Sequence, residues 1–146
     1  MKSFVIAVLM ILSAPCFNGE ILGKDNKSPE IQAQEAMTKQ AQAWNKGDLD
    51  GYMNAYWKSD SLVFIGKSIQ RGWDSVNSSY QKLYSDKSKR GTLNFTYLKT
   101  TTFTENDVMI VGRWEVTIYE AKRGGNFTVI MKKINNEWKV VYNHTS

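Results

Sequence analysis

Apolar residues follow three different spacings along the chain, and the changes between them divide it into parts. Residues 4–12 form an unbroken apolar run, residues 31–46 carry apolar side chains three and four positions apart, and apolar and polar residues alternate from residue 91 onward. A helix places residues three and four apart on one face, whereas a strand turns successive side chains to opposite faces. The pattern predicts a leader, then helices, then strands.

Three helices are predicted, over residues 31–46, 49 to about 57, and 73–84. Pro29 and Glu30 suit the first turn of the first helix, and Asp48 is placed to cap the second. A short strand is expected over residues 62–65. Arg71 and Gly72 are expected to close a turn before the third helix.

Four strands are predicted in the second half of the chain, where β-branched and aromatic residues alternate with polar ones. They cover residues 93–102, 108–120, 126–134 and 138–145, with turns at residues 105–107, 123–125 and 135–137. Helices followed by consecutive antiparallel strands form an α+β plan, in which helices cover one face of a sheet.

The first residues have the order of a secretory signal peptide, because Lys2 precedes the apolar run and small residues follow it. The run is too short for an ordinary transmembrane helix, so no stable membrane span is expected. We therefore predict a signal peptide over residues 1–16, a flexible tether over 17–29 and one domain over 30–146, exported to the periplasm or secreted. A lipid anchor on Cys16 is the alternative, although Pro15 fits a lipidation motif poorly.

The composition limits the partners and cofactors of the domain. The net charge of +5 is modest and its basic residues are interrupted by polar ones, so no nucleic-acid partner is expected. Cys16 is the only cysteine and His144 the only histidine, so neither a disulfide nor a metal site is expected. The chain also lacks a glycine-rich phosphate loop and a nucleophile elbow, and no cofactor is predicted.

Short motifs in a fixed order carry a family resemblance. They are Ala43-Trp-Asn-Lys-Gly-Asp48, Phe64-Ile-Gly66, Arg71-Gly-Trp73, Gly112-Arg-Trp114 and Trp138-Lys-Val-Val-Tyr-Asn-His-Thr-Ser146. With the predicted element order, they resemble the nuclear transport factor 2-like superfamily, also called cystatin-like or SnoaL-like, and most of all its domain of unknown function 4440 family.

This resemblance implies a cone of three N-terminal helices packed on a curved, mainly antiparallel sheet, with an interior pocket, in a homodimer. The same scaffold serves ketosteroid isomerases, polyketide cyclases and non-catalytic association domains. A shared fold therefore does not identify the reaction, and the chemistry must be argued from the residues themselves.

His144 is the weak candidate for a catalytic residue. Strand alternation predicts that it shares one face with Trp138, Val140 and Tyr142. It could act as a general base or a hydrogen-bond donor in the pocket, or it could simply anchor the end of the strand.

The carboxylates offer no clear isomerase base. Asp48 and Asp74 occupy positions where helix-capping or first-turn acids belong, and Asp60 lies in a turn. Glu115 alternates with Trp114 and should face away from it.

Two arginines are candidates for binding an anionic group. Arg71 precedes the third helix and Arg113 lies within an apolar strand. For Arg113, an ion pair with Glu115 or a contact between two protomers is the alternative. The aromatic residues expected around the pocket are Trp44, Tyr56, Phe64, Trp73, Tyr80, Trp114 and Phe127.

These observations favour a domain that binds a small apolar or aromatic molecule in an aromatic-lined pocket. An isomerase or lyase of the ketosteroid isomerase type is the first alternative, and a non-catalytic homodimerisation module is the second. Whether the domain is an enzyme stays open at this point.

Overall fold

The computed structural model describes residues 27–146. The predicted signal peptide and residues 17–26 of the predicted tether lie outside the described residues. Within the described part, no helix is long and apolar enough to cross a membrane. The elements follow the order α1, α2, β1, β2, α3, a short 3₁₀ helix η1, and then β3 to β6.

Six strands form one curved sheet in the order β2-β1-β6-β5-β4-β3. The long strands are β3 (Thr92–Thr104), β4 (Asp107–Ile118), β5 (Ala121–Ile134) and β6 (Glu137–Thr145), all paired antiparallel. The short strand β1 (Val63–Ile65) runs parallel to β6, and β2 (Ile69–Arg71) pairs antiparallel with β1. The predicted α+β plan is therefore confirmed.

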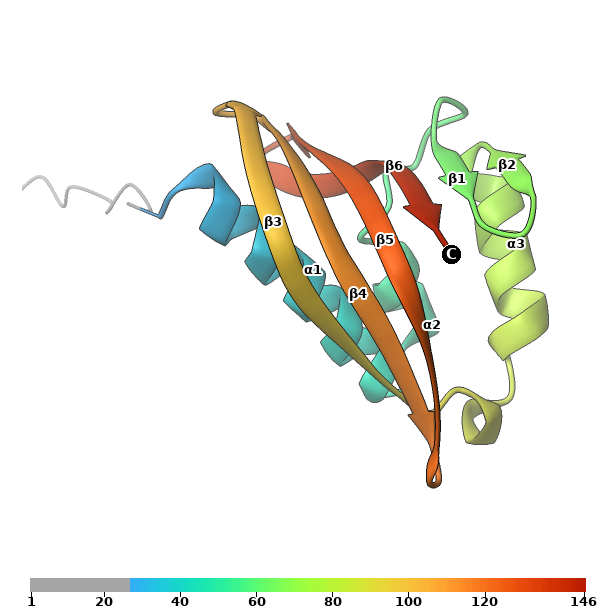
Figure 1. Ribbon diagram of the computed structural model, residues 1–146. Helices are drawn as coiled ribbons and strands as arrows, with labels where there is room; N and C mark the ends of the chain where they lie inside the picture. The colour runs from blue at the N-terminus through green and yellow to red at the C-terminus, as the bar shows by residue number, and fades with distance from the viewer. Residues whose placement is uncertain (1–26) are drawn as a thin grey trace, which may run out of the picture.

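The helices occupy one side of this sheet. Helix α1 (Pro29–Asn45) lies behind the long strands, whereas α3 (Trp73–Tyr84) stands beside β1 and β2, and the end of β6 lies between β5 and α3 (Figure 1). Met37, Ala41 and Trp44 on α1 are buried against the sheet at the spacing that the sequence predicts. The core thus lies between α1 and the concave face of β3 to β6.

Helix α2 (Leu49–Met53) is shorter than predicted. Asp48 caps it as expected, since the side-chain oxygen Oδ1 accepts a hydrogen bond from the Gly51 amide at 2.8 Å. The helix ends at Met53 because the backbone of residues 55–57 forms hydrogen bonds with β6. The Trp57 amide donates to the Val140 carbonyl at 2.9 Å, and the Val140 amide donates to the Ala55 carbonyl at 2.8 Å.

Two predicted turns differ from the structure. The hairpin between β4 and β5 falls at Tyr119 and Glu120, where Tyr119 has a φ of 54°, and not at residues 123–125. Gly124 and Gly125 lie inside β5 because Glu115 and Trp114 of β4 pair with them. Arg71 belongs to strand β2, which was not predicted because its three residues are too few to show alternation.

One extra residue interrupts the pairing of β6 with β5. Tyr142 pairs with Ile130 and Val140 pairs with Met131, so Val141 has no partner in β5. Such a β-bulge changes which face the following side chains occupy. Asn143 is consequently buried, with 8% of its surface exposed, and faces the helices, whereas His144 is exposed.

Candidate functional site

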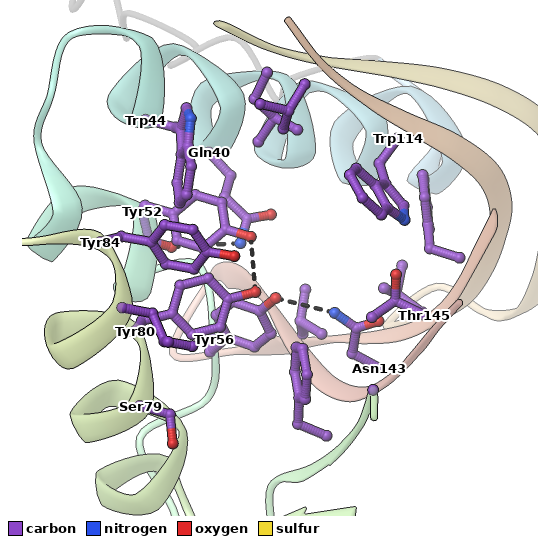
Figure 2. Close-up of a pocket in the computed structure, with 18 of the residues that line it drawn as sticks. Gln40, Trp44, Tyr52, Tyr56, Ser79, Tyr80, Tyr84, Trp114, Asn143 and Thr145 are labelled. Atoms are coloured by element: carbon purple, nitrogen blue, oxygen red, sulfur yellow. Dashed lines mark hydrogen bonds between the residues drawn. The ribbon is translucent and has the colours of Figure 1, made fainter. Parts of the chain in front are cut away.

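A cavity of about 980 Å³ lies between the concave face of the sheet and the helices. Its walls come from α1, α2, α3 and the strands β3 to β6, with additional residues from the β1–β2 loop and η1 (Lys87–Lys89). Figure 2 shows a hollow with a group of tyrosines on one side and Trp114 and Thr145 on the other. This volume lies at the upper end of the range for small-molecule sites.

Aromatic side chains form much of the wall. The predicted residues that the structure brings together around the cavity are Trp44, Tyr56, Phe64, Tyr80, Trp114 and Phe127. The indole groups of Trp44 and Trp114 donate to the main-chain oxygens of Gly91 and Ser146, each at 3.2 Å. Since their polar atoms are satisfied within the protein, both rings offer the cavity apolar surface.

A polar cluster occupies one end of this aromatic wall. The side-chain amide of Asn143 donates to the Tyr56 hydroxyl at 3.0 Å, and the hydroxyls of Tyr52 and Tyr80 lie 3.4 Å apart. The buried Gln40 amide donates to the Tyr52 carbonyl at 3.4 Å. The tyrosine hydroxyls of this cluster therefore gather at one end of the hollow (Figure 2).

The tyrosines of the cluster are neutral over the physiological pH range. Burial raises the pKa of Tyr56, and it raises the pKa of Tyr52 and Tyr80 well above the usual value of 10.0. Neighbouring tyrosines add to the rise at Tyr52 and Tyr80, because two phenolates close together repel each other. The cluster therefore supplies hydroxyl donors and is poorly suited to act as a base.

Asn143 has one buried polar atom without a protein partner. Its amide oxygen Oδ1 accepts no hydrogen bond from the described residues, although the side chain is 92% buried. Buried polar atoms are almost always paired, and an exception calls for an explanation such as a bound molecule or water. The oxygen belongs to a side chain that lines the cavity, where a ligand donor could reach it.

His144 does not share a face with Trp138 and Val140, contrary to the sequence prediction. The bulge at Val141 lies between them and shifts the alternation by one residue. The exposed His144 pairs across the sheet with Thr128 and Ile65 and is one of the residues that border the cavity. Asn143 takes the buried position that the sequence assigns to the histidine.

Three other candidates lie away from the cavity. Arg71 is exposed on the edge strand β2, and Arg113 is exposed on the opposite face of β4 from Trp114. Trp73 packs outside the cavity, where its indole donates to the Met53 carbonyl at 3.1 Å and Lys58 lies 5.0 Å from its ring. All three were expected at the pocket because the sequence does not show which side of an element faces inward.

The alternative explanation for Arg113, an ion pair with Glu115, is also wrong. Glu115 pairs instead with Lys122 of the neighbouring strand, at 3.0 Å. That ion pair is exposed, so it contributes little to stability.

The charged side chains around the cavity are all basic. Lys67, Lys89 and Arg123 border it, and none of its lining residues is an aspartate or glutamate. A ketosteroid-type proton abstraction needs a carboxylate base, and the described lining residues do not supply one. No group of three histidine, cysteine, aspartate or glutamate residues that could hold a metal ion occurs between residues 27 and 146.

Sequence analysis did not single out Asn143, Gln40 or Tyr52 as site residues. The position of Asn143 depends on the bulge, which no sequence pattern indicates. For Gln40 the sequence does hold an indication, because its spacing of three residues from Met37 and four from Trp44 places it on the buried face of α1. A polar residue in an apolar stripe is a candidate for a buried contact.

Comparison with known proteins identifies the family. Residues 33–146 match the SnoaL-like domain family, so the chain belongs to that family. No curated protein sequence matches the chain.

Solved structures support the same assignment. A nuclear transport factor 2-like protein of unknown function from Shewanella oneidensis is similar at 34% identity and a TM-score of 0.77, over 81% of this chain and 98% of that one. A cystatin-like domain of unknown function from Nostoc punctiforme shares 13% identity over 82% and 78% of the two chains, with a TM-score of 0.67. A nuclear transport factor 2-like protein from Salmonella enterica shares 15% sequence identity over 81% of this chain and 89% of that one, with a TM-score of 0.63. The predicted superfamily and fold are confirmed.

Proposed function

We propose that this domain binds a small, largely apolar molecule in the cavity between the sheet and the helices. The observation that carries the proposal is the unpaired, buried amide oxygen of Asn143 beside the Tyr56 hydroxyl, at the end of an aromatic-lined cavity of about 980 Å³. A mostly apolar pocket with a few convergent polar groups is typical of a ligand site. Apolar contact would give affinity, and the polar pair would orient the ligand.

The isomerase or lyase alternative has less support. Among the described lining residues, the tyrosines hold their protons, no aspartate or glutamate is present and His144 is exposed. Simple binding of a ligand needs no base, so it is compatible with this set of residues. A pure dimerisation module, in turn, does not explain an open cavity that carries an unpaired polar atom.

The neutral fluorescent probe N-phenyl-1-naphthylamine tests the binding proposal. We expect saturable binding to the wild-type domain. Ser79 on α3 lines the cavity, whereas the adjacent Ser78 is exposed and does not line it. The substitution Ser79→Trp should therefore fill cavity space and weaken binding at least tenfold, and Ser78→Trp should leave it unchanged.

Circular dichroism would confirm that both serine variants are folded. Absence of saturable binding to the wild type would refute the proposal. Equal binding by the two variants would also refute it, because the probe would then lie outside the cavity.

We also propose that the domain forms a homodimer through the outer face of the sheet. The partly buried side chains of Val63, Tyr142, Ile130 and Met109 form a row across four strands on that face, and no described helix covers it. An apolar sheet face without a covering layer favours association. Light scattering should give twice the chain mass for the wild type and the single mass for Ile130→Lys, and a monomeric wild type would contradict the proposal.

Export of the domain is likewise a proposal, which rests on the order of charged, apolar and small residues in positions 1–16. Fusing residues 1–29 to alkaline phosphatase, which is active only in an oxidising compartment, tests it. We expect an active fusion and loss of activity when Leu9→Arg interrupts the apolar run. Activity that survives this substitution would argue against a signal peptide.

A further inference from the structure

The charged and the uncharged polar residues around the cavity differ in exposure. Lys67 of the β1–β2 loop, Lys89 of η1 and Arg123 of β5 border the cavity, and all three are exposed. Lys89 lies 3.4 Å from the exposed Asp86, and neither Lys67 nor Arg123 forms an ion pair with another described residue. We call these three residues the basic rim.

The buried end is polar but uncharged. The Tyr56 hydroxyl accepts a hydrogen bond from Asn143 and has the hydroxyls of Tyr52 and Tyr80 beside it, whereas the Asn143 amide oxygen needs a donor. A hydroxyl group of a ligand can supply that donor. An ionised group here would face the Asn143 oxygen and have no charged partner, which is unfavourable in a buried site.

Much of the remaining cavity wall is apolar. Phe64, Phe127, Val129 and Trp114 belong to the cavity wall, and none of them offers an unpaired polar atom. An apolar and partly aromatic body is therefore the complement of the middle of the cavity.

We infer that the ligand is an amphipathic organic anion, with a hydroxyl group bound between Tyr56 and Asn143, an apolar body against the aromatic wall, and its anionic group at the basic rim. The inference rests on the proposed function and specifies the chemical class of the ligand. Three cations attract an anion when no aspartate or glutamate side chain lines the cavity beside them, and their exposure makes this attraction sensitive to salt.

Two probes with the same aromatic body test the anionic part of the inference. 1-Anilinonaphthalene-8-sulfonate carries a negative charge that N-phenyl-1-naphthylamine lacks. A rim variant combines Lys67→Gln, Lys89→Gln and Arg123→Gln. We expect it to weaken binding of the sulfonate about tenfold and to leave binding of the neutral probe within about twofold.

A matched control removes the same total charge elsewhere. Lys39→Gln, Lys46→Gln and Lys82→Gln change three exposed lysines that do not line the cavity. Sulfonate binding to this control should stay within about twofold of the wild type. An equal loss in both triple variants, or a rim variant that binds the sulfonate normally, would overturn the inference.

The two proposals fail in distinguishable ways. If the neutral probe does not bind, or binds Ser79→Trp as well as Ser78→Trp, the proposed function itself is wrong. If the neutral probe binds in the cavity and the rim variant has no selective effect on the sulfonate, only the ligand class is wrong.

The hydroxyl end is tested separately by displacement of the neutral probe. We expect 2-naphthol to displace it at lower concentration than naphthalene does from the wild-type domain. This difference should disappear in Asn143→Leu, which removes the unpaired oxygen and keeps a similar volume. A difference that persists in this variant would contradict the assignment of the hydroxyl group to Asn143.

Discussion

Arg90 is a buried cation that is bound by backbone carbonyls, and its replacement gives the sharpest stability prediction. It is 5% exposed and lies between η1 and β3. Its guanidinium donates to the carbonyls of Tyr84, Gly47 at 2.7 Å and Ser85 at 3.4 Å. It thereby joins the end of α3 to the turn between α1 and α2, next to Lys89 of the basic rim.

The magnitude follows from these contacts. A hydrogen bond to a charged group contributes roughly 1.5–3 kcal/mol, and a buried carbonyl left unpaired adds a cost. With two short bonds near the lower end of this range and one long bond that adds little, Arg90→Met should lower the free energy of unfolding by about 3–4 kcal/mol. For a domain of about 120 residues, 1 kcal/mol corresponds to about 4 °C, so the Tm should fall by about 12–16 °C.

Thermal unfolding followed by circular dichroism measures this effect, with two variants for comparison. Arg90→Lys keeps the charge but cannot reach three carbonyls at once, so it should lower the free energy of unfolding by about half as much as Arg90→Met. Lys89→Met changes the adjacent residue, whose side chain is 76% exposed, and should shift the Tm by less than about 2 °C. The reasoning would be refuted if the Tm of Arg90→Met fell by less than about 4 °C, or if Arg90→Lys were as stable as the wild type.

Three further predictions concern the cavity and β6. Because burial raises the pKa of Tyr52, Tyr56 and Tyr80 above 10.0, their contribution to stability is complete below that pH and is lost as the pH rises above it. Absorbance at 295 nm should show three of the seven tyrosines ionising only together with unfolding, and ionisation of all seven in a folded domain would contradict this. Gly125→Ala would make the added methyl group collide with the main-chain oxygen of Ser146, so the end of β6 should shift and the tryptophan fluorescence of Trp114 should move to longer wavelength; an unchanged spectrum would count against it. Deletion of Val141 should remove the bulge and keep Asn143 facing inward, because Tyr142 would then follow Val140 in regular alternation and keep Ile130 as its partner. Binding of the neutral probe should stay within about twofold of the wild type, and loss of binding in a folded variant would contradict this register.

The elements with the strongest periodicity could be predicted from the sequence. Helix α3 begins at Trp73 and ends at Tyr84 as expected, because apolar residues recur on one face and Gly72 precedes it with a φ of 81°. Helix α2 is shorter than its pattern indicates, since β6 forms hydrogen bonds with residues 55–57. Long-range pairing of this kind overrides a local helical pattern.

The aromatic part of the candidate site was easier to predict than its polar part. Large rings such as Trp44 and Phe127 are buried in most packings, so composition alone makes them candidates. The arginine candidates were wrong because the inward face of a strand depends on the register of the sheet. Arg113 faces outward beside Trp114, and Arg123, which borders the cavity, was assigned to a turn.

The bulge at Val141 has the largest chemical consequence, because it decides which side chain enters the cavity. With strict alternation from Trp138, His144 would face the tyrosines and bring an imidazole, a side chain able to act as a general base, into the site. With the bulge, Asn143 enters instead, and an amide neither gains nor loses a proton in that range. The site therefore keeps fixed donors and acceptors among neutral tyrosines, which suits the orientation of a bound molecule better than the transfer of a proton.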